Sequence, residues 1–215
     1  IANIREQCSW VHENTEKATE KAHVIVRQSI EKVKLNEPLD PIIVPVTRRA
    51  LVVGGGVAGI RAALDVANSG HQVYLVEKTG SIGGRMAQLS ETFPTLDCSI
   101  CILGPLMVEA YRNPNIKILR LSEVEEVKGF VRNFKVKVRQ APVYVDETKC
   151  NSCAECVKVC PAEVPNEFDS GLTWRKAIYI PFAQAVPPVY VLDAKSCLGL
   201  LPQACGECKK ACDKL

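Results

Sequence analysis

Three glycines in one short run have the spacing of a turn that binds the phosphates of a dinucleotide. The run Gly54-Gly55-Gly56-Val57-Ala58-Gly59 matches G-x-G-x-x-G and directly follows the apolar stretch Ala50–Val53. The first glycine permits a tight strand-to-helix turn, the second lets the backbone approach a pyrophosphate, and the third lets helix and strand pack closely. The N–H groups at the start of the following helix would bind the phosphates.

An acidic residue should follow such a turn by about 20 residues, at the end of the second strand, where it binds the ribose hydroxyls. Glu77 stands 18 residues after Gly59, behind the apolar stretch Gln72–Val76 and before Lys78. An acid at this place, instead of a basic residue, argues against a 2′-phosphate on the ribose. The order of strand, glycines, helix, strand and acid therefore predicts a dinucleotide site.

Spacing alone does not decide between FAD and NAD. The next run, Gly80-Ser81-Ile82-Gly83-Gly84-Arg85-Met86, resembles the second signature of FAD-binding proteins of the glutathione reductase superfamily. In those proteins the Gly-Gly pair lies close to the flavin nucleotide. The resemblance favours FAD, and it adds Gly83, Gly84, Arg85 and the neighbouring Lys78 to the residues expected at the cofactor.

Eight of the eleven cysteines lie in residues 147–215 and follow a second pattern. The run from Cys150 to Cys160 reads Cys-x2-Cys-x2-Cys-x3-Cys-Pro, which is the pattern of bacterial ferredoxins. A zinc site would need all four ligands at one centre, and the proline after the fourth cysteine favours iron and sulfur. The later run, Cys-x7-Cys-x2-Cys-x3-Cys, has a longer first gap, which predicts an inserted loop over Leu198–Ala204, and Asp213 where a proline would stand.

In two-cluster ferredoxins the fourth cysteine of each run binds the neighbouring cluster. This crossover assigns Cys150, Cys153, Cys156 and Cys212 to one [4Fe–4S] cluster. It assigns Cys160, Cys197, Cys205 and Cys208 to the other.

Three cysteines remain, and three interpretations of them stay open. Cys98 and Cys101 form a C-x2-C pair after the flavin signature, and Cys8 lies near the start of the chain. The pair is either a redox-active disulfide beside the flavin, or two ligands of a third cluster completed by Cys8 and a group outside this chain. The third interpretation is that these thiols are buried packing residues.

The elements that position these residues divide the chain into three segments. Residues 1–47 contain a helix over Thr15–Val33 and a linker with several prolines. Residues 48–146 form an α/β unit, the first half of a Rossmann-like FAD-binding domain, with a helix over Val57–Ser69. Residues 147–215 are too small and irregular to build much apolar core, so bound metal is expected to stabilise them, and the charged residues between the two cysteine runs are expected at the surface. Antiparallel strands are expected at 117–121, 123–128 and 134–139.

Composition excludes several classes of protein. Lys and Arg number 27 against 24 Asp and Glu, so charge gives no indication of nucleic-acid binding. No stretch approaches the roughly 18 consecutive apolar residues of a membrane span, and there is no signal-peptide pattern. We therefore expect a cytoplasmic protein whose many thiols bind metal, because an odd number of cysteines cannot all pair within the chain.

Four further segments carry a family resemblance. They read NIREQCSWVH at 3–12, TFPTLDCSIC at 92–101, RKAIYIPF at 175–182 and QAVP at 184–187. With the glycine turn and the cysteines, they resemble the A subunit of heterodisulfide reductase, an iron–sulfur flavoprotein of methanogens, related archaea and some anaerobic bacteria. The resemblance implies a glutathione/thioredoxin reductase-like flavin domain split by an inserted α+β ferredoxin domain, with this chain as the front part of the full-length protein.

The resemblance also implies flavin-based electron bifurcation. A partner hydrogenase or formate dehydrogenase would supply an electron pair to FAD. One electron would go to the heterodisulfide of coenzymes M and B in other subunits of an oligomeric complex, and one to ferredoxin. The residues themselves support a narrower statement: flavin exchanges electrons in pairs or singly and a cubane carries one, so a chain with both converts between them.

Two rival functions differ in class. One is a pyridine-nucleotide-linked oxidoreductase of the glutamate synthase small-subunit type, but there the ferredoxin cysteines precede the glycine turn and here they follow it. The other is a non-catalytic electron-transfer subunit with an empty flavin site. A flavin absorption spectrum separates the second rival from an enzyme.

Overall fold

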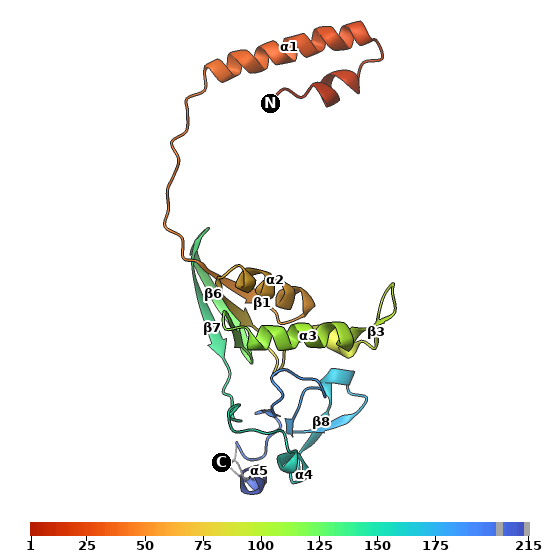
Figure 1. Ribbon diagram of the computed structural model, residues 1–215, viewed down its shortest axis with the longest axis vertical. Helices are drawn as coiled ribbons and strands as arrows, with labels where there is room; N and C mark the ends of the chain where they lie inside the picture. The colour runs from red at the N-terminus through yellow and green to blue at the C-terminus, as the bar shows by residue number, and fades with distance from the viewer. Residues whose placement is uncertain (201–203, 213–215) are drawn as a thin grey trace. The chain divides into compact units, whose positions relative to one another are not determined.

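The computed structural model describes residues 1–200 and 204–212 (Figure 1). The chain divides into two compact units, Ile1–Val44 and Pro45–Leu215. The expected boundary between a flavin domain and a ferredoxin domain, at residues 146–147, falls inside the second unit and stays a prediction. Among the described residues, none of the helices is long and apolar enough to cross a membrane.

The N-terminal unit is helical. A π-helical turn, η1 over Arg5–Ser9, precedes α1 over Thr15–Lys34, which confirms the expected helix. α1 begins after Asn14, because the side-chain oxygen of this residue accepts hydrogen bonds from two backbone N–H groups of the first turn. Ile25 is buried within the unit, whereas the apolar side chains nearer the end of the helix are exposed.

A three-stranded parallel sheet forms the centre of the second unit, in the order β1-β2-β5. β1 covers Arg49–Val53, α2 covers Val57–Asn68 and β2 covers Gln72–Val76, each within one residue of its predicted bounds. α3, over Ser99–Arg112, then leads back to β5 at Ile116–Leu119. Since both crossovers are helical, all three strands run in the same direction, as in a dinucleotide-binding half-fold.

Helices α2 and α3 pack on each other and on the sheet (Figure 1). Their apolar faces supply most of the buried core, and Ile82, after β2, and Val186, from the later part of the chain, complete it. The core residues are Ile60, Ala63, Leu64, Ala67, Val73, Leu75, Ile82, Leu103, Met107, Ala110, Ile116 and Val186.

The direction of β5 and the presence of α3 differ from the sequence prediction. The alternation of apolar and polar residues predicts an antiparallel strand at β5, but β5 pairs in parallel with β2. The reason is α3, a helical crossover that contains Pro105 and that the sequence patterns did not indicate. The next two strands, β6 over Ser122–Phe130 and β7 over Asn133–Gln140, form the expected antiparallel hairpin.

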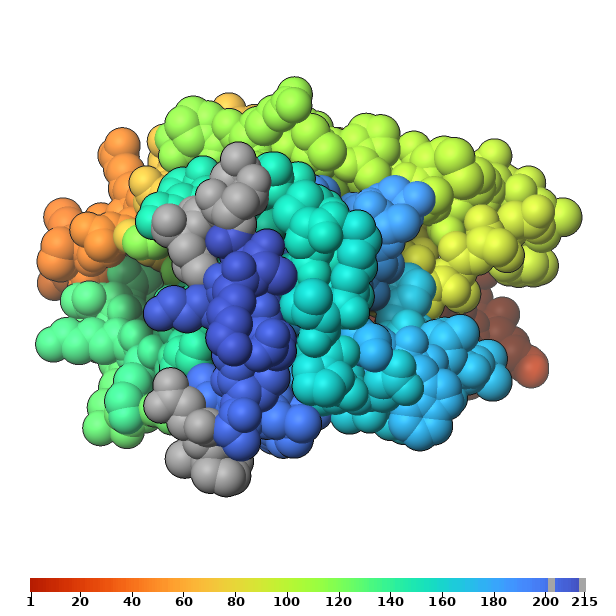
Figure 2. Space-filling model, turned by 90° about the horizontal axis from the view of Figure 1, so that it is seen from below, coloured from red at the N-terminus to blue at the C-terminus, as the bar shows by residue number. Residues whose placement is uncertain are grey.

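The rest of the second unit is built from short elements. α4 and α5, which carry cysteines of the two runs, lie against each other, as the cyan and dark blue segments of Figure 2 show. The expected loop over Leu198–Ala204 lies partly outside the described residues. The remaining elements are η2 Gly84–Gln88, β3 Glu91–Thr92, β4 Asp97–Cys98, α4 Glu155–Lys158, β8 Glu163–Pro165, η3 Glu167–Asp169, β9 Trp174–Lys176, β10 Ile178–Tyr179, β11 Val191–Leu192 and α5 Glu207–Ala211.

Candidate functional site

The glycine turn has the backbone geometry that the sequence predicts. Gly54 has φ +103°, in the region that favours glycine, and so turns the chain sharply at the end of β1. A Cβ on Gly59 would overlap the carbonyl oxygen of Gly54, so α2 packs directly against the turn. At Gly56 a Cβ would have no neighbour within 4 Å among the described residues, which leaves space in front of Val57 and Ala58, the first residues of α2.

Glu77 lies at the end of β2, buried at 7% exposure, and contacts the turn directly. Its Oε2 accepts a hydrogen bond from the backbone N–H of Gly55 at 2.7 Å, and its Oε1 accepts one from the backbone N–H of Thr79 at 2.8 Å. The Thr79 hydroxyl lies 2.9 Å from Oε1 and 2.8 Å from the carbonyl oxygen of Ser81, but its single hydrogen serves one acceptor at a time. The carboxylate therefore has acceptor capacity beyond these bonds.

The second glycine signature is bonded to the first. The N–H of Gly83 donates to the carbonyl oxygen of Gly55 at 2.7 Å, and a Cβ on Gly84 would lie 2.9 Å from Cα of Gly56. Both Gly83 and Gly84 have positive φ, at 127° and 58°, so the close approach requires glycine. The structure thus brings together the two signatures that the sequence singled out.

A cavity of about 450 Å³ opens beside Glu77. Lys78, Gly84 and Arg85 line it as well, so three of the predicted cofactor residues border this space along with the acid. Arg85 lies in η2, directly after the Gly-Gly pair. A dinucleotide that binds at the turn can extend into this cavity.

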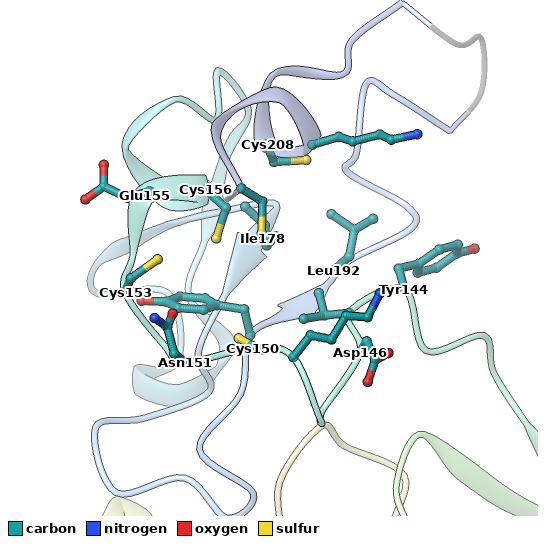
Figure 3. Close-up of a pocket in the computed structure, with 15 residues that line it drawn as sticks. Tyr144, Asp146, Cys150, Asn151, Cys153, Glu155, Cys156, Ile178, Leu192 and Cys208 are labelled. Atoms are coloured by element: carbon teal, nitrogen blue, oxygen red, sulfur yellow. The ribbon is translucent and has the colours of Figure 1, made fainter. Parts of the chain in front are cut away.

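Five cysteines line a second cavity, of about 230 Å³. The side chains of Cys150, Cys153, Cys156 and Cys208 border it in Figure 3. Cys212 is the fifth. Four of the five form the set that the crossover assigns to one cluster, and Cys208 is shared with the next cavity.

The neighbouring cavity is lined by Cys160, Cys197, Cys205 and Cys208, the set assigned to the other cluster. The N–H of Gly199 points at Sγ of Cys197 from 3.4 Å. N–H groups aimed at cysteine sulfur are one means by which proteins adjust cluster potentials. The assignment of both sets to clusters stays a prediction.

Two of the thiols that line these cavities, Cys156 and Cys208, disfavour ionisation. Burial raises the pKa of Cys156 to about 11, and the nearby Cys150 and Cys153 add to the effect. Burial also raises the pKa of Cys208, with a further contribution from Cys197. Bound iron would supply the positive charge that lets such thiols ionise, so these donors fit clusters.

Ligands of a single metal ion must lie close enough together to reach one point, whereas ligands of a cubane need not. Across residues 1–200 and 204–212, no three His, Cys, Asp or Glu side chains come close enough together to hold one ion. In a cubane each thiolate binds a different iron atom, so its ligands are spread around a larger centre.

The three remaining cysteines lie in different units. Cys98 and Cys101 form a disulfide at the start of α3, and both residues are exposed. Cys8 is buried in η1 of the N-terminal unit, where its carbonyl oxygen accepts a hydrogen bond from Nδ1 of His12 at 3.0 Å. In the disulfide form neither sulfur can bind iron, so the third-cluster hypothesis requires that bond to be reduced. Both this and the redox-disulfide hypothesis stay predictions.

The segment between the two cysteine runs was expected to carry surface charges, and this was wrong for Arg175. Its side chain is 7% exposed and pairs with Glu167 and with Asp193, the latter at 3.1 Å. Its guanidinium carbon lies 3.9 Å above the ring of Tyr179. Sequence reasoning missed this residue because an arginine followed by a lysine in a short irregular segment carries no sign of its burial.

The same segment contacts the flavin signature. Ser81 Oγ accepts a hydrogen bond from the N–H of Val186 at 2.9 Å, and the N–H of Ile82 donates to the carbonyl oxygen of Val186 at 3.2 Å. The side-chain amide of Gln88 donates to the carbonyl oxygen of Phe168 at 2.8 Å. No local pattern in the sequence indicates these contacts, since they join residues about 80 to 105 positions apart.

Comparisons with known proteins give a family model and several relatives that this chain matches. Residues 50–156 match the family model described as FAD dependent oxidoreductase. The chain is 60% identical over 193 residues to the second iron–sulfur A subunit of the CoB–CoM heterodisulfide reductase of Methanopyrus kandleri, covering 89% of this chain and 29% of that protein. It is 53% identical over 213 residues to the corresponding iron–sulfur protein of Methanocaldococcus jannaschii, covering 99% of this chain and 32% of that protein.

The chain belongs to the family of heterodisulfide reductase A subunits. Its α/β unit has the Rossmann-like fold of an FAD-dependent oxidoreductase, as the sequence predicted. The chain spans 29% to 32% of the length of these relatives. A further relative, 47% identical over 194 residues, is the A subunit of the H2/formate:CoB–CoM heterodisulfide,ferredoxin reductase of Methanococcus maripaludis; the match covers 90% of this chain and 30% of that protein.

Solved structures resemble this chain only with low TM-scores. The L-proline dehydrogenase of P. horikoshii is 27% identical, covers 49% of this chain and 21% of its own, and gives a TM-score of 0.38. The Lactococcus lactis thioredoxin reductase is 18% identical, covers 44% of this chain and 32% of its own, and gives a TM-score of 0.37. Scores this low carry no argument about function.

Proposed function

We propose that this chain is part of an iron–sulfur flavoprotein that transfers electrons between FAD and [4Fe–4S] clusters in a heterodisulfide reductase-type complex. The observation that carries the proposal is the pair of cysteine-lined cavities, which adjoin each other in the same compact unit as the glycine turn. Ile178, Leu192 and Cys208 line both cavities. Two clusters held there would be separated by single side chains.

The dinucleotide residues would hold FAD through its phosphates and ribose. The first N–H groups of α2 bind the pyrophosphate, and Gly56 leaves it room. Glu77 accepts hydrogen bonds from the ribose hydroxyls while it fixes Gly55. Gly83, Gly84 and Arg85 flank the nucleotide, and the two cations Lys78 and Arg85 face the same cavity.

The eight thiolates would hold two clusters in the crossover arrangement. Each run supplies three ligands to one cubane and its last cysteine to the other, which ties α4 and α5 together. The two cysteine runs, as far as the structure describes them, contain no buried apolar residue, so thiolate–iron bonds take over part of the role of a core there. Gly199 donates toward Cys197 and so adjusts the charge that this ligand carries.

Bound FAD takes up electrons in pairs and releases them singly, and each cubane carries one electron. The relatives' names include hydrogen, formate, the CoB–CoM heterodisulfide and ferredoxin as reactants. We infer that the complex works by flavin-based bifurcation, with a hydrogenase or formate dehydrogenase as donor. The acceptors are the heterodisulfide, through the other reductase subunits, and ferredoxin.

The cofactor content of the full complex tests the first part. We expect anaerobically purified complex to release FAD and to contain iron and acid-labile sulfide in equal amounts. Variants Cys153→Ala and Cys205→Ala should each lose about four iron atoms per copy of this chain. Equal iron contents in these variants and in wild type would refute the cluster assignment, and cluster absorbance without flavin would favour the non-catalytic electron-transfer protein.

Electron balance tests bifurcation separately. With hydrogen or formate as donor, the complex should reduce ferredoxin only when the heterodisulfide is also supplied, and each acceptor should receive half of the electrons. Ferredoxin reduction that continues without the heterodisulfide would leave electron transfer in place but exclude bifurcation.

A further inference from the structure

The segment between the two cysteine runs forms one wall of the cavity beside Glu77. Lys78 and Arg85, which follow the strand β2, line one side. Phe168 and Tyr179, which lie about 80 to 100 residues later, line the other. A cavity that starts at a predicted dinucleotide site is thus closed by residues that no dinucleotide motif contains.

This wall is fixed in place by several contacts. The rings of Phe168 and Phe182 stack with their centroids 5.1 Å apart and their planes at 20°. The carbonyl oxygen of Phe168 accepts the hydrogen bond from Gln88, one turn after the Gly-Gly pair. Phe182 also approaches Gly83, since a Cβ there would lie 3.2 Å from its ring. The aromatic surface is therefore held against the second glycine signature.

Contact with Arg175 fixes the position of the Tyr179 ring. The guanidinium of Arg175 covers one face of its ring at 3.9 Å, and Arg175 is itself anchored by Glu167 and Asp193. A cation on one face of an aromatic ring stabilises its position when the pair is desolvated. The ring of Tyr179, which lines the cavity, is accordingly held in a fixed position.

The position of the cavity decides which part of a dinucleotide it could take. The pyrophosphate of such a ligand lies at the glycine turn, and the carboxylate at the end of the second strand binds the ribose of the adenosine half. Glu77, Gly84 and Arg85 line the cavity, whereas Gly54–Gly56 do not. What lies beyond the ribose on that side is the base.

We propose that Phe168 and Tyr179 form the adenine-binding wall of the FAD site, so that the segment between the cysteine runs determines selection of FAD over FMN. This inference rests on the proposed FAD site. Purine bases stack on aromatic side chains, and Asn166 and Gln88, which also line the cavity, offer amide groups to the edge of the base. FMN has no adenosine half and would not contact this wall.

The test uses the full-length protein in its complex, depleted of flavin and kept anaerobic. The variant is Phe168→Ala, and the matched control is Trp174→Ala, an exposed aromatic residue of the same segment that does not line the cavity. Fluorescence titration measures the dissociation constants of FAD, FMN and ADP. We expect Phe168→Ala to weaken FAD and ADP by about tenfold and to leave FMN unchanged, since one stacked base is lost. Trp174→Ala should behave as wild type.

Iron content, measured in parallel, shows whether the segment still folds. If Phe168→Ala loses iron, Phe168→Leu replaces it, because leucine keeps most of the apolar volume and removes the ring. Wild-type FAD and ADP affinities in a variant that retains its iron would overturn the proposal. In that case a loss of FAD in Glu77→Ala would leave the proposed FAD site standing. A wild-type protein that binds no flavin would overturn both.

Discussion

Glu77 is the residue on which the dinucleotide site most depends. Its buried carboxylate holds the N–H of Gly55 on one side and the N–H of Thr79 on the other. It therefore joins the glycine turn to the start of the loop that carries the second signature. In the proposed FAD site, a single side chain would therefore both bind the ligand and shape the site.

We predict that Glu77→Ala lowers FAD retention more than Glu77→Gln. Alanine removes every acceptor, whereas glutamine keeps one oxygen for Gly55 or for the ribose. Loss of charge-assisted hydrogen bonds of about 1.5–3 kcal/mol corresponds to a roughly 10- to 150-fold weaker dissociation constant for FAD in Glu77→Ala. Fluorescence titration of released flavin measures it, with the exposed Glu91→Gln as control. Equal retention in Glu77→Ala and wild type would move the ribose contact to another residue.

Two glycines in helices allow a matched comparison of stability. A Cβ on Gly59 would overlap the backbone oxygen of Gly54, whereas a Cβ on Gly104 would have no described neighbour within 4 Å. We expect Gly59→Ala to destabilise the fold by about 1–3 kcal/mol. Gly104→Ala should stay within about 1 kcal/mol of wild type, because the higher helix propensity of alanine is offset by the following Pro105, which disfavours helical backbone at the residue before it. Guanidinium denaturation followed by circular dichroism checks both, and a neutral Gly59→Ala would mean that α2 can shift away from the turn.

At the scale of elements, the notable feature is the joint between the second glycine signature and the segment between the two cysteine runs. Gly80 lies so close to Val191 that a Cβ would overlap the valine side chain. Ser81 Oγ accepts a hydrogen bond from the N–H of Val186, and its hydrogen serves the carbonyl oxygen of either Ile82 or Val186. This joint connects the core of the parallel sheet to the segment between the two cysteine runs.

We predict that Ser81→Ala destabilises the second unit by about 1–3 kcal/mol, because the buried N–H of Val186 loses its acceptor. The control Ser90→Ala, at an exposed position, should stay within about 0.5 kcal/mol of wild type. Denaturation midpoints measure both. If Ser81→Ala unfolds at the wild-type midpoint, another group or a water molecule satisfies Val186.

Ion pairs also connect parts of the segment between the two cysteine runs. The buried Arg175 pairs with Asp193 and with the largely exposed Glu167, although these residues lie on separate short segments. A hydrogen bond from Arg175 lowers the pKa of Glu167. The pair with Glu167 would lose strength as the pH falls through that lowered pKa, because the protonated carboxyl no longer attracts the guanidinium.

At the scale of the whole molecule, the crossover of cluster ligands connects the two cysteine runs. We predict that the double variant Cys153→Ala/Cys212→Ala loses about four iron atoms relative to wild type, because both residues serve one cluster. The double variant Cys153→Ala/Cys160→Ala should lose about eight, because these residues serve different clusters. Without crossover the two results would be exchanged. Iron and sulfide analysis of the anaerobic complex measures them.

The sequence alone could predict the parts whose signals are local. The strands and helix around Gly54 follow from a short apolar run, a glycine turn and an amphipathic stretch, so their bounds agree with the structure within a residue. Similarly, the capped α1 and the β6–β7 hairpin have regular periodicity. α3 was missed because its apolar positions are interrupted by Pro105, and without it the direction of β5 could not be inferred.

What the sequence by itself determined was the chemistry: glycine geometry and cysteine spacing are fixed by covalent distance along the chain, so they indicate a dinucleotide turn and two sets of thiols. Only the tertiary structure decided which distant residues meet them. Val186 joins the sheet core and Phe168 lines the cavity of Glu77 because packing brings together segments about 80 to 105 residues apart, and Arg175 is buried by contacts within its own segment. Such contacts depend on complementary shape and shared burial, which leave no periodic trace in the order of residues.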